Sequence, residues 1–439
     1  MALLRPLLLA VLVLAVPVRA QEPALRARIA AALERVPALD DHAHLLEAAP
    51  FDPSAGREDP LLWQGTRPDF LRILQERFGV TWNPDRPGAS QAAALQARAA
   101  RVARLGGESA YWRDHLRAAR TEAVLVNQPG PEGTDGVGLR WVPTASPLLW
   151  PWPGALQARS PESAGELAVF REQLGAWLRA EGQAGPPATL GAYLAFLDRH
   201  LRRWRAQGAA ALKFVEAYHR TLRFEPVSRA RAAGLWERGF HGPLDRAETL
   251  ALSDFLARHL FRQAGRLHLP VHLHTGLGGS RRLRLREADP LLLEDLVTDP
   301  AFDGTDFVLL HAGAPDPRPA AALAAFKPNV WLDLSGLALD LSPAELAAAL
   351  RTCLTLAPTR TLYGTDAFGG FQVPLGAEVP HLALGEALRR ALTEALASLV
   401  EDGTLDEARA LNLGRGVLRD HARRLYGWDR EGPSSSRNP

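Results

Sequence analysis

Short apolar runs rich in β-branched residues alternate with longer amphipathic stretches along almost the whole chain. Eight of the short runs predict β-strands, at Val36–Asp40, Glu122–Asn127, Leu139–Thr144, Ala210–Val215, Pro270–His274, Asp306–His311, Asn329–Leu334 and Thr361–Thr365. The longer stretches predict helices between them, at Leu190–Gln207, Arg246–Arg266, Pro290–Thr298, Pro319–Phe326, Pro343–Leu356 and Leu382–Val400. Strands that alternate with helices favour βα units and a parallel sheet. Eight such units favour an α/β fold closed as a (β/α)8 TIM barrel over an open sheet.

The segment after the first strand departs from this alternation. Arg57–Arg120 is predicted to be a helical insertion, with helices at Arg67–Phe78 and Gln91–Leu105. A loop rich in Pro and Trp is expected at Pro147–Pro153, after the third strand. No repeat of fixed period is visible, so one barrel domain with insertions over residues 21–429 accounts for this pattern.

The two ends of the chain differ from this central domain. A basic start at Arg5, an apolar run at Leu7–Val16 and the small residue Ala20 predict a signal peptide over residues 1–20. We therefore expect export, to the periplasm or out of the cell. A membrane anchor is the alternative, but the run is shorter than the roughly 20 residues that span a bilayer. No later segment predicts a membrane span, and residues 430–439 are expected to be a disordered tail.

The composition is that of a globular protein, with 439 residues, 47% hydrophobic, 23% charged and a formal net charge of +2. It excludes a disordered chain and a nucleic-acid binder that relies on bulk positive charge, and it is compatible with a monomer or an oligomer. Among the 51 basic residues only Lys213 and Lys327 are lysines. A general bias toward arginine explains this ratio, yet a surviving lysine can mark a position whose chemistry arginine cannot supply.

Residues that can bind a metal follow five of the predicted strands. They are His42, His44, Lys213, His272, His274, His311 and Asp366. Side chains at i and i+2 on a strand point the same way, so His42 and His44 can meet at one ion. The C-terminal ends of the strands carry the active site in (β/α)8 barrels. Imidazole and carboxylate groups therefore predict a divalent metal site here, with Zn²⁺ favoured and Mn²⁺ or Fe²⁺ as alternatives.

Such a site has a definite chemistry. A bound divalent ion lowers the pKa of its water from about 15.7 toward about 7 and so supplies hydroxide at neutral pH. Asp366 can accept the proton as the water attacks, and the ion or a nearby imidazole can stabilise the oxyanion. The residues thus predict hydrolysis of an amide, C–N or ester-type bond in a small molecule.

The same residues resemble those of the amidohydrolase superfamily of metal-dependent hydrolases. The closer resemblance is to its amidohydrolase-2 branch, and there to the domain found fused ahead of glutamine-synthetase-like domains. The matching stretches are Leu39–His44, Ala211–Tyr218, His274–Gly278, Leu309–Ala312, Asn329–Ser335 and Leu362–Ala367. Their order and spacing, rather than any one of them, make the match specific.

The resemblance implies roles for the strand-end residues. His42 and His44 match the metal ligands of the first strand. Asp366 matches the carboxylate of the eighth strand, which binds metal and takes the proton from the attacking water. His274 matches the ligand of the fifth strand, whereas His272 is expected to lie in the shell around the site.

The resemblance leaves two positions open. His311 either binds a second metal or polarises the substrate carbonyl. Lys213 is either carboxylated and bridges two metals, or stays an ammonium that binds a substrate carboxylate or a catalytic group. A purely structural Lys213, paired with Glu216 or another acid, is the further alternative. The number of ions, one or two, stays open with it.

The residues that contact the substrate are harder to predict. Relatives tend to carry acidic residues after the His-Thr-Gly motif, whereas this chain has four arginines there, beginning with Arg281. This run is either a solvated basic loop or a site for an anionic small molecule, because arginine binds carboxylate and phosphate in a bidentate manner. Arg140, on the third strand, and Tyr218 and Arg220, after the fourth, are the other candidates.

Two other functions fit the same residues. A metal-dependent decarboxylase or lactonase can use this site, because the amidohydrolase-2 branch includes such enzymes. A barrel that binds a small molecule without turnover is the non-enzymatic alternative. The complete set of ligand residues favours an enzyme.

Overall fold

The computed structural model describes residues 22–46, 66–134, 136–152, 161–280, 283–369 and 375–428. The predicted signal peptide, the predicted tail and the first part of the predicted insertion lie outside these residues. Within the described ranges, no helix is both long enough and apolar enough to cross a membrane.

Parallel strands follow one another along the described chain in the predicted order. Their bounds are β1 Ala38–Ala43, β2 Thr121–Asn127, β3 Leu139–Val142, β4 Leu212–Phe214, β5 Val271–His274, β6 Phe307–Leu310, β7 Val330–Asp333 and β8 Thr361–Leu362. Strands pair in their order along the chain: β1 pairs with β2 and β2 with β3 in one sheet, and β4 to β8 pair successively in the other. Nearly every strand residue is buried, which explains why the runs are continuously apolar rather than alternating.

Backbone hydrogen bonds join the two sets of strands at both seams. Beyond β3, the Lys213 amide donates to the Pro143 carbonyl at 2.9 Å, and the Ala145 amide donates to the Lys213 carbonyl at 2.7 Å. Beyond β8, the Asp41 amide donates to the Tyr363 carbonyl at 2.8 Å. The eight strands therefore form the predicted (β/α)8 barrel, which is confirmed.

The predicted helices are found with similar bounds, except that Pro290–Thr298 begins as a 3₁₀ turn, and helices such as Pro161–Ala180 and Arg229–His241 were not predicted. The helices are α1 Glu22–Glu34, α2 Pro68–Phe78, α3 Pro87–Leu105, α4 Glu108–Ala118, α5 Pro161–Ala180, α6 Leu190–Ala206, α7 Arg229–His241, α8 Arg246–Arg266, α9 Glu294–Thr298, α10 Arg318–Phe326, α11 Leu337–Asp340, α12 Pro343–Leu356, α13 Glu378–Glu401, α14 Glu407–Arg415 and α15 His421–Tyr426. The starts of α6 and α8 are marked by Thr189 and Asp245, whose side chains accept backbone N–H groups of the first turn. Because these caps are local, they make such boundaries predictable.

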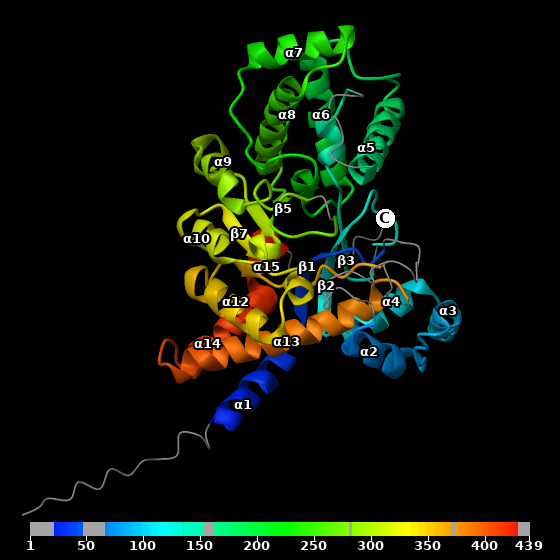
Figure 1. Ribbon diagram of the computed structural model, residues 1–439, viewed down its shortest axis with the longest axis vertical. Helices are drawn as coiled ribbons and strands as arrows, with labels where there is room; N and C mark the ends of the chain where they lie inside the picture. Colours follow the sequence, from blue (N-terminus) through cyan, green and yellow to red (C-terminus); the bar gives the residue numbers. More distant parts are fainter. Residues whose placement is uncertain are drawn as a thin grey trace, which may run out of the picture.

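Two excursions extend the barrel (Figure 1). The first is the predicted helical insertion after β1, formed by α2, α3 and α4, which packs beside α13. The second holds α5 and α6, between β3 and β4, and lies with α7 and α8 at one end of the molecule. The expected loop at Pro147–Pro153 is partly wrong, because Ser146–Leu149 forms a buried 3₁₀ turn.

The C-terminal helix α15 closes the barrel at the N-terminal ends of the strands. Ala422, Tyr426 and Trp428 pack with residues that face the barrel interior, among them Leu39 and Leu125. The opposite end, where the strands finish, is therefore the one that stays accessible to a small molecule.

Candidate metal centre

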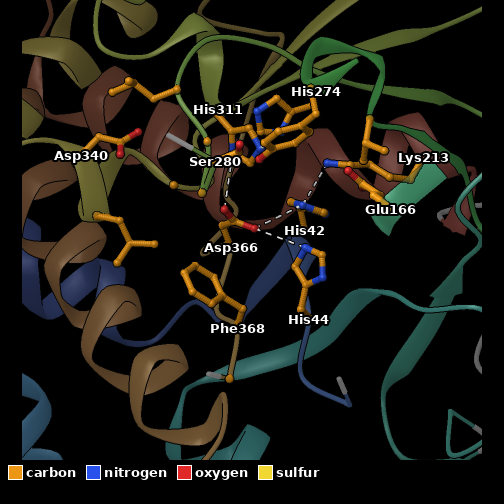
Figure 2. A pocket seen from close by; sticks show the side chains of 18 residues that line it. His42, His44, Glu166, Lys213, His274, Ser280, His311, Asp340, Asp366 and Phe368 are labelled. Carbon is orange, nitrogen blue, oxygen red and sulfur yellow. Dashed lines mark hydrogen bonds and ion pairs between the residues drawn. The ribbon is translucent and has the colours of Figure 1, made fainter. Parts of the chain in front are cut away.

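The C-terminal ends of the strands surround a cavity of about 460 Å³ (Figure 2). The structure brings six of the residues predicted to bind the metal to its wall, namely His42, His44, Lys213, His274, His311 and Asp366. They come from β1, β4, β5 and the segments that follow β1, β6 and β8. Residues separated by more than 300 positions thus share one site because the barrel brings their strand ends together.

Three of these residues form a compact ligand group. Suitable atoms of His42, His44 and Asp366 all lie within 4.8 Å of one another. Asp366 Oδ1 lies 3.3 Å from His42 Nε2 and 3.6 Å from His44 Nε2. Two imidazoles and a carboxylate at this spacing match the ligand types that divalent transition metals prefer.

The charge state of the cavity also suits a cation. Burial lowers the pKa of His42 and His274 well below the usual range and that of His311 to about 4, so these imidazoles are neutral at neutral pH. Burial alone would raise the pKa of Asp366, but the neighbouring His311 and His42 hold it below its ordinary value. An ionised carboxylate among neutral imidazoles offers lone pairs and one negative charge, which a divalent cation complements.

Ser335 fixes the orientation of the His311 ring. His311 Nδ1 lies 3.1 Å from the Ser335 carbonyl oxygen, which can only accept a hydrogen bond, so Nδ1 carries the proton. The lone pair of His311 is then on Nε2, which lies 3.0 Å from His274 Nδ1. Tautomer control of this kind is typical of imidazoles that bind a metal or a reacting group.

A further observation tests whether these residues fit a metal. His274 Nε2 is buried without a hydrogen-bond partner among the described residues. An unpaired polar atom in such a place calls for an ion or a water. Together with the ligand group of His42, His44 and Asp366, this orphaned nitrogen shows that the donor set fits a metal centre.

Lys213 lies at the inner edge of the site. Its side chain is buried, and Nζ lies 3.3 Å from His42 Nε2. Burial lowers the pKa of Lys213 from 10.5 to about 8, while Asp366 and two further carboxylates favour the charged form. A hydrogen bond between Lys213 and Glu216, the structural alternative, is absent from the described contacts, in which Glu216 Oε2 accepts the Ser146 hydroxyl at 3.0 Å.

His272 lies below the cavity rather than in its wall. Its Nε2 is 2.7 Å from the hydroxyl of Tyr426, which itself donates to Asp41 at 2.5 Å. Tyr426 comes from α15, which closes the other end of the barrel. Since His274 lines the cavity and His272 does not, the fifth strand offers His274 as the ligand.

The predicted substrate residues lie in different parts of the structure, and only one of those described lines the cavity. Tyr218 lines the cavity and packs against His274, with ring centroids 4.6 Å apart and the rings tilted. Arg281 lies outside the described residues. Arg140 is not part of the cavity wall, because its guanidinium lies over the ring of Trp428 at the closed end of the barrel. The expectation that Arg140 faces the pocket is corrected accordingly.

Arg220 is also placed away from the cavity. It is fully buried, and its guanidinium forms an ion pair with Asp254 at 2.5 Å and donates to the Arg223 carbonyl at 2.7 Å. All of its charge is thus used inside the protein, between the segment after β4 and helix α8. We therefore assign Arg220 to stability rather than to substrate binding.

Replacing Arg220 tests this assignment. Arg220→Met is expected to lower the free energy of unfolding by about 3–5 kcal/mol, because it leaves Asp254 buried without its partner. Arg223→Met is the control, since its side chain is about half exposed, and it should change stability by less than about 1 kcal/mol. Urea denaturation followed by circular dichroism measures both. A stable Arg220→Met protein that binds substrate poorly would instead return Arg220 to the substrate site.

Some residues that line the cavity were not predicted from the sequence. Glu166 from α5, Asp340 from α11 and Phe368 after β8 all line the cavity. Glu166 Oε2 lies 3.0 Å from Nε2 of the buried His219. No local motif marks Glu166, since it occupies an ordinary helical position, and only the folded chain brings it over the barrel.

Comparison with known proteins agrees with this geometry. The sequence pattern of the family described as Amidohydrolase matches residues 152–428, which is more than half of the chain. The chain belongs to the amidohydrolase family. The resemblance drawn from the strand ends is thereby confirmed, and so is the expectation of a metal-dependent superfamily member.

The amidohydrolase is also similar to a curated protein. Protein fluG of Emericella nidulans is 27% identical over 433 aligned residues, which cover 91% of this chain and 47% of fluG. The amidohydrolase thus spans about half the length of this relative.

Solved structures that share the fold include members of different enzyme classes. One described as a metal-dependent hydrolase, from Lactobacillus casei ATCC 334, is 20% identical with a TM-score of 0.64 and covers 92% of this chain and 99% of its own. Glucuronate isomerase from Caulobacter crescentus is 14% identical with a TM-score of 0.61, covering 95% and 96%. Uronate isomerase from Thermotoga maritima is 16% identical with a TM-score of 0.58, covering 92% and 97%. These likenesses establish the barrel, and the reaction has to be argued from the site.

Proposed function

We propose that this amidohydrolase is an exported, metal-dependent hydrolase that cleaves an amide, C–N or ester-type bond of a small molecule. One observation carries the proposal: neutral imidazoles and the ionised Asp366 line one cavity at the open end of the barrel. Membership of the amidohydrolase family supports it. The expectation of export rests on the N-terminal sequence alone.

His42, His44 and Asp366 would hold the metal, with His274 and His311 beside them. We propose Zn²⁺, because imidazole nitrogen and carboxylate oxygen are its usual ligands in hydrolytic sites. When bound, such an ion lowers the pKa of a coordinated water and polarises a carbonyl. The remaining steps belong to the protein's own side chains.

Asp366 moves the proton. Its carboxylate is ionised at neutral pH and lies at the centre of the ligand group. It accepts a proton from the attacking water and returns it to the departing nitrogen or oxygen, so that the leaving group departs neutral. Because Ser335 holds the proton of His311 on Nδ1, its Nε2 accepts a hydrogen bond from His274 Nδ1, which leaves the lone pair of His274 on Nε2, unpartnered among the described residues.

The rest of the cavity shapes and orients the substrate. Leu277, Leu339 and Phe368 give it an apolar wall, which favours a substrate with an apolar portion of modest size. Gly278 keeps this space open, because a Cβ there would lie 2.2 Å from the Tyr218 hydroxyl and 2.8 Å from His274 Nε2. The Tyr218 hydroxyl is thus placed to donate a hydrogen bond to a substrate oxygen.

Metal analysis and product analysis test this proposal together. The purified protein is expected to hold one or two divalent ions per chain, measured by inductively coupled plasma mass spectrometry. It should hydrolyse a member of a panel of N-acyl amino acids, dipeptides, cyclic amides and lactones. In water enriched in a heavy oxygen isotope, the product carboxylate should carry the label.

The same assays identify the competing functions. Release of CO₂, with no label from water in the remaining organic product, would indicate a decarboxylase. Aldose–ketose conversion of hexuronates would indicate an isomerase. A protein that neither retains nor rebinds a divalent ion would contradict a metal-dependent enzyme altogether.

A further inference from the structure

A second buried carboxylate, Asp40, lies directly behind the metal centre. It precedes His42 by two residues in β1 and has no exposed surface. Its Oδ1 accepts the backbone N–H groups of His42 at 3.2 Å and of Thr365 at 3.0 Å. Its Oδ2 accepts the hydroxyl of Thr365 at 2.5 Å. One carboxylate therefore ties the segment that carries His42 to the segment that carries Asp366.

Thr365 extends this tie around Asp366. Its hydroxyl oxygen also accepts the N–H of Ala367 at 3.3 Å, and the N–H of Asp366 donates to the His42 carbonyl at 2.8 Å. The backbone is thus held at Asp366 and on both sides of it. This restraint matters because Asp366 has φ of 53°, a left-handed conformation that residues other than glycine rarely adopt. The tie acts together with the backbone bonds from Asp366 to His42 and from His44 to Ala367, and so helps to keep the ligand carboxylate turned toward the two histidines.

The contacts continue from Asp40 into the helical insertion. His381 of α13 places Nε2 3.2 Å from Asp40 Oδ2, and its Nδ1 lies 2.9 Å from Nε2 of His115 in α4. Both imidazoles are buried. Nε2 of His381 has no hydrogen-bond partner among the described residues, so its approach to Asp40 is a close polar contact rather than a hydrogen bond. A buried row of polar groups thus connects the insertion to both ligand segments.

We infer that Asp40 and Thr365 are positioning residues that set the affinity of the metal centre. The inference rests on the proposed metal site. A ligand held in place before the ion arrives loses less conformational freedom when it binds. Groups that orient metal ligands typically change metal affinity by about 10–100-fold when they are removed.

Thr365→Val in the full metal-free chain tests this inference, because valine keeps the shape and removes the hydroxyl. Zn²⁺ alone is titrated in competition with a chromogenic chelator. The affinity is expected to fall by about 10-fold or more, whereas Thr365→Ser, which keeps the hydroxyl, should stay within about 3-fold of the parent. Thr361→Val is the matched control. Thr361 is a buried threonine of β8 whose hydroxyl donates to the Ala357 carbonyl at 2.9 Å, at the closed end of the barrel.

A second readout separates positioning from general stability. The visible spectrum of the Co²⁺-loaded Thr365→Val protein should differ from that of the parent, because the ligand geometry changes. The spectra of the Co²⁺-loaded Thr365→Ser and Thr361→Val proteins should match that of the parent. If Thr365→Val does not fold, Thr365→Ala against Thr365→Ser gives the same comparison.

The possible failures are distinguishable. The inference is overturned if a folded Thr365→Val protein binds Zn²⁺ as tightly as the parent and has the same Co²⁺ spectrum. The proposed metal centre would then still stand. Equal weakening by Thr361→Val also overturns it, because any buried threonine would then have the same effect. A parent that binds neither Zn²⁺ nor Co²⁺ overturns the proposed metal site and the inference with it.

Discussion

Asp366→Asn is expected to lower turnover by about 10²–10⁴-fold, even at metal concentrations that saturate the variant. Asparagine keeps the shape of the side chain, but it is neutral and cannot take a proton from water. The metal-free variant should still fold but be somewhat less stable than the parent at neutral pH, because the lowered pKa of Asp366 means that the folded chain favours the ionised carboxylate. Steady-state kinetics on a substrate identified in the panel, with metal content measured on the same samples, checks the result.

Asp340→Asn is the control for this experiment. It removes the same charge from the same cavity, but Asp340 lies outside the ligand group of His42, His44 and Asp366. It should change turnover by less than about 10-fold. An active Asp366→Asn protein beside an inactive Asp340→Asn protein would place the proton acceptor at Asp340 and contradict the mechanism.

The barrel could be predicted from the sequence because its strands are buried on both faces. Runs such as Phe307–Leu310 are apolar without interruption, and helices such as Arg246–Arg266 begin at a capping residue that is visible in the sequence. The eighth strand is the exception. It was expected over Thr361–Thr365 but ends at Leu362, since the chain must leave the ladder to reach the left-handed conformation at Asp366.

The cavity could be predicted as far as strand ends determine it. The C-terminal ends of all strands lie around one opening of a barrel, so the histidines, Lys213 and Asp366 could be grouped without a structure. For an arginine in a loop, the position in the sequence does not predict which way the side chain faces. Arg220 pairs with Asp254, 34 residues away on another element, and the sequence alone cannot distinguish this from a side chain that faces the cavity. The positioning network was missed for the same reason, because Asp40 and Thr365 are 325 residues apart.

Lys213→Arg is expected to reduce turnover by about 100-fold or more while the protein stays folded. Lys213 is buried with Nζ 3.3 Å from His42 Nε2, a space that suits an amine better than a planar guanidinium. Burial lowers the pKa of Lys213 to about 8, so the neutral amine is accessible near neutral pH, whereas arginine stays charged. Only the neutral amine can react with CO₂ to form a carbamate. Native mass spectrometry then decides between the two roles: one added CO₂ on the parent indicates a carboxylated lysine, and an unmodified parent indicates the ammonium.

A stability measurement on the metal-free chain tests the same environment without any substrate. In the unfolded chain Lys213 keeps its proton up to a pH near 10.5, but in the folded chain it loses the proton near pH 8. The unfolded state therefore binds more protons between these values, and stability rises with pH across this window. Relative to Lys213→Met, the parent should gain roughly 3 kcal/mol between about pH 8 and 10.5, measured by urea denaturation. If the difference in unfolding free energy between the parent and Lys213→Met does not change with pH, Lys213 is not held in a desolvated site. A Lys213→Arg protein as active as the parent would remove Lys213 from the mechanism, because the guanidinium would then serve equally well.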